Sequence, residues 1–152
     1  MSLYYGHMVR ILHWCTDQRM TSTLETMELT SSQGRIMGFL SRQPEPPCPR
    51  DVEEAFQLRH PTVSGILSRL EQKGFIQLLS DPSDRRCKRI HILQKGHECH
   101  QTMLHTIQSN EEQMVRDFSP EEKALFADFL QRAIVNMGGS PCHFNPKEES
   151  KQ

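Results

Sequence analysis

The clearest pattern of apolar and polar positions lies in the middle of the chain, over residues 61–74. Apolar residues return there every three or four positions, the spacing of one helix face: Val63, Ile66, Leu67 and Leu70. Pro61 suits the first helical position, and Gly74 suits the left-handed position after the last turn. The residues outside the apolar stripe are small, polar or basic: Thr62, Ser64, Gly65, Ser68 and Arg69. This pattern predicts a helix with one buried and one exposed face.

A hairpin is predicted directly after this helix. Residues 75–79 and 88–93 have the composition of strands, and residues 80–87 between them carry turn-forming residues and a basic tip. A shorter helical pattern, from Pro49 to Leu58, precedes the central helix. Helix, turn, helix and basic hairpin together predict a winged helix-turn-helix. The predicted fold class is therefore mainly α, or α+β by strict count, with a two-stranded wing.

Basic charge is concentrated on this segment. Residues 59–96 contain eight lysines and arginines against three acidic residues, although the whole chain has a net charge of −1. A helix fits the major groove of DNA, and arginines of a neighbouring hairpin can reach phosphates or the minor groove. The charge pattern thus predicts double-stranded DNA as a partner.

Helical patterns also flank the motif. We expect a first helix over residues 3–27, with a break near residues 21–23 as an alternative, and a second from the cap residues near Thr30 to Gln43. Prolines make residues 44–47 a connector. After the hairpin, Lys95-Gly96 is expected to precede a long helix over residues 97–118.

The last predicted helix begins at Ser119-Pro120, which combines a serine cap with a proline in the first turn. Its apolar face is too dense for a monomer of this size to cover: Leu125, Phe126, Phe129, Leu130 and Ile134. Gly138-Gly139 ends this helix. The polar residues 139–152 are expected to be disordered.

The central motif resembles the MarR family of bacterial transcriptional regulators. The resemblance rests on the runs PTVSGILSRLEQKGFI, DPSDRRCKRIHIL and QKG, in this order. It implies a homodimer on a pseudo-palindromic operator, with a DNA-binding domain over residues 30–96 and dimerisation helices over residues 1–29 and 97–138. One departure is Leu93-Gln94 where the family commonly has leucine and threonine. Glutamine caps a helix poorly, so the start of the long helix is open.

The resemblance also implies roles for single residues. The base-reading positions would be Thr62, Ser64 and Arg69, with Arg59 or His60 near phosphate. Asp84 would orient Arg86, which would enter the minor groove. The full predicted DNA-binding set is Arg59, His60, Thr62, Ser64, Gly65, Ser68, Arg69, Asp84, Arg85, Arg86, Lys88 and Arg89.

Regulation by a small molecule is a further implication of the resemblance. DNA binding by a repressor of this family is usually relieved by a small aromatic or phenolic effector or by cysteine oxidation. The corresponding cleft would be lined by Met8, Ile11, Leu12, Cys15, Ile36, Phe39 and Leu40. The simpler alternative is that these residues are ordinary core.

Other chemistry has little support in the sequence. The five cysteines form no CxxC pair, so reduced thiols are expected, and Cys87 between cationic neighbours is the candidate for a redox role. The run His97-Glu98-Cys99-His100 is one residue short of the HExxH zinc pattern, so no metal or cofactor is predicted.

The function classes can be narrowed in the same way. No nucleophile and base, phosphate loop or carboxylate pair has an interpretable spacing, so the chain is not expected to be an enzyme. No apolar run or leader pattern is present, which predicts a cytoplasmic protein without membrane contact. The rival interpretation is a winged domain that serves protein interactions and never binds DNA.

Overall fold

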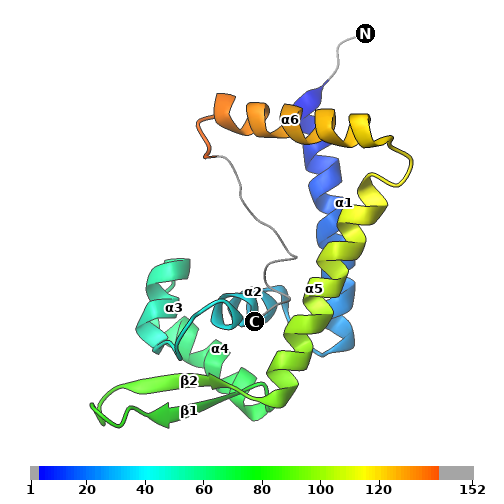
Figure 1. Cartoon of the computed structure of the whole chain (residues 1–152). Helices are drawn as coiled ribbons and strands as arrows, with labels where there is room; N and C mark the ends of the chain where they lie inside the picture. Colours follow the sequence, from blue (N-terminus) through cyan, green and yellow to red (C-terminus); the bar gives the residue numbers. More distant parts are fainter. Residues whose placement is uncertain (1–3, 141–152) are drawn as a thin grey trace. The chain divides into compact units, whose positions relative to one another are not determined.

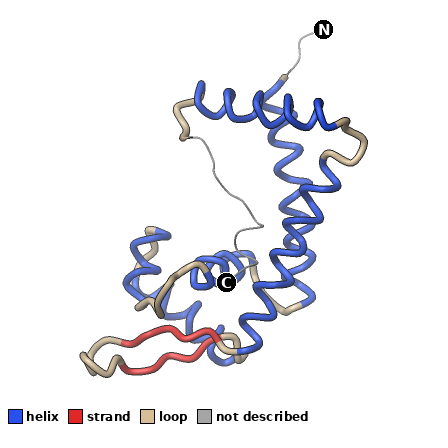
Figure 2. The backbone as a smooth tube through the Cα atoms, in the orientation of Figure 1, coloured by secondary structure: helices blue, strands red, loops and turns tan. Residues whose placement is uncertain are grey.

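The computed structural model describes residues 4–140 (Figures 1 and 2). Its elements follow the order α1 (Tyr5–Thr26), α2 (Ser31–Ser41), α3 (Pro49–Phe56), α4 (His60–Gln72), β1 (Ile76–Ser80), β2 (Lys88–Ile92), α5 (Gln94–Met114) and α6 (Pro120–Asn136). The chain divides into two compact units, one up to Thr106 and the other from Ile107. The mainly helical winged helix-turn-helix predicted from the sequence is confirmed. Within the described residues, no helix is long and apolar enough to cross a membrane.

Local capping explains where the helices of the winged part begin and end. Thr30 caps α2, since its hydroxyl accepts from the Gln33 N–H while the Gln33 side chain accepts from the Thr30 N–H. Helix α4 begins at His60, so Pro61 occupies its second position, one residue later than predicted. Gly74 has a φ of +78°, and the N–H of Phe75 donates to Leu70 O over 3.0 Å. These contacts close α4 with a Schellman turn, as Gly74 predicted.

The wing is a two-stranded antiparallel sheet, shown in red in Figure 2. Its register pairs Ile76 with Ile92 and Ser80 with Lys88. A third segment joins it, because the Ile90 N–H donates to the carbonyl oxygen of Pro47 over 2.8 Å. The connector between α2 and α3 is therefore bound to the root of the wing.

One apolar core supports α4 and the wing from beneath. The predicted stripe of α4 contributes Val63, Leu67 and Leu70, and each of them is at most 1% exposed. Phe75 and Ile76 enter the same core from the start of the hairpin. Further core residues come from the other elements of this unit: Leu24, Ile36, Met37, Leu40, Val52, Ile90 and Cys99. Burial of so many apolar side chains fixes the hairpin against the helices.

Helix α1 is continuous, so the alternative of a break near residues 21–23 is wrong. The Thr23 hydroxyl donates to the carbonyl oxygen of Arg19 over 3.1 Å and lies 2.9 Å from the Thr106 hydroxyl. The Thr26 hydroxyl donates to Thr23 O. Threonine side chains that bond back to the preceding turn are tolerated inside a helix, which a propensity argument does not capture.

Helix α5 begins at Gln94, three residues earlier than predicted. The carbonyl oxygen of Leu93 accepts from the N–H groups of Gly96 and His97, so the first turn forms without a side-chain cap. Gly96 is buried inside this turn rather than ahead of the helix. A Cβ at Gly96 would lie 2.3 Å from Phe75 O, so the residue allows two backbones to approach closely.

In the second unit, Ser119 caps α6 with a capping box that includes Glu122, as the sequence predicted. The rings of Phe118 and Phe126 meet edge to face at 5.6 Å. None of the residues of α6 is buried. Of the tail predicted to be disordered, only Gly139 and Ser140 lie inside the described residues.

Candidate nucleic-acid interface

The outer face of α4 is an exposed polar surface on a rigid support. All five residues predicted to face outwards are exposed: Thr62, Ser64, Gly65, Ser68 and Arg69. The carboxylate of Glu71, near the end of the helix, accepts from the Leu78 N–H of β1 over 2.8 Å. Helix and wing are thus joined by a polar contact as well as by the shared core. The structure places the α4 candidates on one surface.

The start of α4 brings a histidine against the preceding helix. His60 Nδ1 lies 2.6 Å from the Glu53 carboxylate of α3, and the histidine side chain remains mostly exposed. Arg59, the N-cap residue, is also exposed. Glu53 was not singled out in the sequence, because the six residues between it and His60 include an unpredicted left-handed residue, Gln57, with φ +51°.

The tip of the wing carries the exposed side chains of Arg85, Arg86 and Lys88. The carboxylate of Asp84 accepts from the main-chain N–H of Arg86 over 3.0 Å. Asp84 therefore shapes the turn. The resemblance had implied that Asp84 orients the side chain of Arg86, but in the structure the carboxylate bonds the main chain of Arg86 and not its guanidinium. An aspartate reaches the main-chain amide two residues later more readily than the side chain.

A different aspartate, Asp81, pairs with one arginine of the wing, Arg89. Asp81 is 7% exposed, and its carboxylate accepts from the Arg89 Nε over 2.7 Å. It also accepts from the N–H and the hydroxyl of Ser83, over 2.8 and 2.6 Å. The hydrogen bonds from Ser83 and Arg89 hold the pKa of the Asp81 carboxyl below its usual range, and Asp81 in turn raises the pKa of Arg89.

Sequence reasoning missed Asp81 as a functional residue and predicted a DNA contact for Arg89. The Asp-Pro-Ser run was a signal for a turn, since aspartate often accepts from a residue two positions on. The partnership with Arg89 depends on the strand register, in which Arg89 is opposite Leu79 and diagonal to Asp81. That register was not determined by the sequence pattern.

Comparison with known proteins finds a family match in the winged part of the chain. The profile of the MarR family matches residues 27–86, which span α2, α3, α4 and the first strand of the wing. Residues 27–86 therefore carry the sequence pattern of the MarR family. MarR proteins are transcriptional regulators and not enzymes.

Relatives and solved structures agree with this assignment. An uncharacterised HTH-type transcriptional regulator of Bacillus subtilis, YxaD, is 32% identical over 83 residues, which are 55% of this chain and 58% of YxaD. MepR, a transcription regulator of the Staphylococcus aureus multidrug efflux pump MepA, is 25% identical with a TM-score of 0.80, over 89% of this chain and 99% of MepR. A MepR–DNA complex gives 26% identity and a TM-score of 0.76, over 88% and 99% of the two chains.

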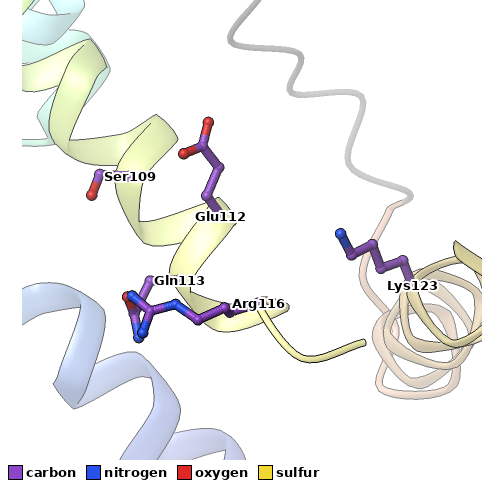
Figure 3. A pocket seen from close by; sticks show the side chains of 5 residues that line it. All are labelled: Ser109, Glu112, Gln113, Arg116 and Lys123. Atoms are coloured by element: carbon purple, nitrogen blue, oxygen red, sulfur yellow. The ribbon is translucent and has the colours of Figure 1, made fainter. Parts of the chain in front are cut away.

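The residues predicted to line an effector cleft differ in their exposure, and the cleft stays a prediction. Ile36 and Leu40 are buried core residues, whereas Met8 and Ile11 are about half exposed on α1. Leu40 also lines a hollow of about 240 Å³ between the connector and β2, together with Pro47, Ile90 and His97. A second hollow, of about 400 Å³, is lined by polar side chains: Ser109, Glu112, Gln113, Arg116 and Lys123 (Figure 3). It lacks the apolar wall that an aromatic ligand needs.

The thiols of this chain differ in their surroundings. Cys15 is exposed, Cys48 and Cys87 are half-buried, and Cys99 is buried, where loss of solvation raises the pKa of its thiol. The redox role of Cys87 stays a prediction. Within residues 4–140, His, Cys, Asp and Glu side chains form no cluster of three or more that could hold a metal ion.

Proposed function

We propose that this chain is a transcriptional regulator that binds duplex DNA through α4 and the wing. The observation that carries the proposal is the exposed polar face of α4 beside an arginine-rich hairpin, both fixed by one core. Helix α4 would enter the major groove, where Ser64 and Arg69 can reach base edges. Arg86 would reach the adjacent minor groove, where narrow segments concentrate negative potential.

Electrostatics supports this proposal. The local excess of basic residues lies on the segment that forms α4 and the wing, within a chain of nearly neutral charge. Arg59, His60 and Lys88 would contact phosphates around these two elements. Because phosphate contacts release counterions, affinity should fall with salt, by about −0.9 in the slope of log K against log salt per contact. The solved MepR–DNA complex is a second support, since MepR shares this fold.

The proposed assembly is a homodimer on a pseudo-palindromic operator. Its support is the apolar surface of α6, where Leu125 and Phe129 are more than half exposed. The N-terminal part of α1 is similar, with Tyr5 and Trp14 exposed. Residues 1–29 and 97–138 would form the dimerisation part, and residues 30–96 the DNA-binding domain. A two-fold dimer would place its half-sites about 10 base pairs apart, or a multiple of that distance.

Regulation by a small molecule is a further part of the proposal. We propose a cytoplasmic repressor whose DNA affinity falls when a small aromatic or phenolic effector binds. The hollow at Leu40 favours an effector near the wing, because its lining combines apolar side chains with two histidines, His91 and His97. Thermal shift with a set of phenolic acids, followed by DNA titration with each stabilising compound, tests this part.

The central experiment is a titration of purified protein against selected genomic duplex, single-base variants of it and random duplex. Ser64→Ala and Arg69→Ala should each cost about 1 to 3 kcal/mol on the selected duplex and relax preference at particular base pairs. Arg86→Ala should weaken binding to selected and random duplex alike, with a shallower salt slope. Arg132→Ala is the matched control, because it removes one exposed arginine from α6.

Two outcomes would contradict the proposal. Wild-type protein that retains no duplex at any salt concentration would favour a winged domain that serves protein interactions. Binding that is unchanged by Ser64→Ala, Arg69→Ala and Arg86→Ala would separate DNA affinity from the proposed interface. A loss caused equally by Arg132→Ala would point to net charge alone.

A further inference from the structure

Asp81 is the most highly connected polar side chain of the wing. It accepts two hydrogen bonds from Ser83 in the hairpin loop and one from Arg89 in β2, with all three distances between 2.6 and 2.8 Å. Its own N–H donates to the carbonyl oxygen of Cys87 over 2.9 Å, which closes the base of the loop. Asp81 is nearly buried, whereas the neighbouring Asp84 is exposed.

The contacts of Arg89 extend this network to the helical layer. Arg89 Nε donates to Asp81, and Arg89 Nη1 lies 3.4 Å from the carbonyl oxygen of Pro46 in the α2–α3 connector. The neighbouring residue, Ile90, donates its N–H to Pro47 O. Loop, strand and connector are therefore held together around one carboxylate.

We propose that Asp81 is a positioning residue that fixes the pose from which Arg85 and Arg86 reach DNA. Asp81 acts through its hydrogen bonds with Ser83 and Arg89. In this proposal Arg89 binds Asp81 and does not contact a DNA phosphate. The inference rests on the proposed DNA-binding function and adds the group that organises it. The exposed loop tip, residues 82–87, has few apolar anchors of its own, so polar contacts at its base decide its orientation.

The direction in which DNA affinity changes when Asp81 is replaced distinguishes a positioning role from a simple effect of charge. Removal of Asp81 makes the wing more positive by one charge, and charge alone predicts tighter binding to polyanionic DNA. Positioning predicts the opposite, because Arg85 and Arg86 lose their fixed orientation. A weaker complex after loss of an acidic residue is therefore diagnostic.

The test compares Asp81→Asn and Asp81→Ala with Glu45→Gln in DNA titrations. Glu45 is an exposed acid in the connector, so its change adds the same charge near the wing without touching the network. We expect Asp81→Asn to weaken binding to selected duplex by about tenfold, Asp81→Ala at least as much, and Glu45→Gln to leave it equal or tighter. Thermal unfolding of each variant checks that the fold is retained.

Two further measurements distinguish positioning from a general structural role. In a double-mutant cycle, Arg86→Ala should cost much less in the Asp81→Asn background than in the wild type, since the arginine is already misplaced. The exchanged pair Asp81→Arg with Arg89→Asp should restore part of the affinity lost by Asp81→Ala. Amide exchange of the Ser83 N–H should accelerate in free Asp81→Asn protein.

The outcomes separate this inference from the proposed function. Wild-type protein that binds duplex, together with Asp81→Asn that binds as well or better, would refute positioning alone. Fully additive effects of Asp81→Asn and Arg86→Ala would refute it as well. Wild-type protein that binds no duplex would overturn the proposed function, and the inference would fall with it.

Discussion

The winged core and helix α6 use the same kinds of residues with opposite results. In the winged core, three of the four stripe residues of α4 are at most 1% exposed, and they share a core with Val52, Phe75 and Ile76. In α6 an equally regular stripe leaves Leu125 53% and Phe129 56% exposed. Both helices have well-formed ends. Apolar spacing therefore indicates which face of a helix will be covered, and it does not indicate whether the cover comes from the same chain.

Helix α1 contains both situations within one element. Near its C-terminal end Leu24 is 3% exposed and belongs to the core of the winged part. Towards its N-terminal end Met8 and Trp14 are 57% and 61% exposed. A protein rarely leaves such a large apolar surface in water. The two exposed stripes, on α6 and on the first half of α1, are thus the surfaces on which the proposed dimer depends.

The largest expected effect comes from a charge placed on the exposed stripe. Phe129→Asp should reduce the mass measured by light scattering from twice 17.7 kDa to 17.7 kDa, since a carboxylate cannot be buried unpaired in an apolar interface. Gln131→Glu is the control, because it adds the same charge to α6 outside the predicted stripe. A wild-type protein that is already monomeric would remove the comparison between the two regions.

Truncation of a leucine to alanine should affect unfolding differently in the winged core and in α6. Leu67→Ala should lower the free energy of unfolding by about 3 kcal/mol, because Leu67 is 1% exposed. Denaturant titrations should give the same loss at low and high protein concentration. Leu125→Ala should have its main effect on association, so its loss should change with concentration. Equal concentration dependence for both variants would mean that the winged core is not independent of the dimer.

Local rules predicted the helices well, and long-range packing explains what they missed. Caps such as Thr30 and Ser119 act within four residues, so the sequence alone identified them. The role of Gly96 depends on Phe75, which approaches from another part of the chain. The pairing of Asp81 with Arg89 depends on a strand register that no local pattern determines. The outer face of α4 was predicted correctly because helical periodicity alone decides it.

Two glycines provide a smaller and sharper test of the core. Gly96→Ala should destabilise the protein by about 1 to 3 kcal/mol, since the added Cβ would lie 2.3 Å from Phe75 O and 2.6 Å from Ile92 Cγ2. Gly65→Ala is the matched control, because no atom lies within 4 Å of its added Cβ. Alanine inside a helix should stabilise α4 by about 0.5 to 1 kcal/mol. Similar unfolding midpoints for the two variants would contradict the tight packing of α5 on the wing.

The smallest effect compares the same capping motif in both regions. Thr30→Ala and Ser119→Ala each remove a hydroxyl that accepts a main-chain N–H over 3.2 Å, so each should cost about 1 kcal/mol locally. Thr30 begins a helix of the buried core, and its loss should appear in the global free energy of unfolding. Ser119 begins a helix without buried residues, so its loss should appear as faster amide exchange at the start of α6 and weaker association. Circular dichroism with denaturant measures the first effect, while hydrogen exchange and dilution measure the second. If both variants lower global stability equally and leave association unchanged, α6 folds as part of the core. The winged core and α6 would then not differ in how they are stabilised.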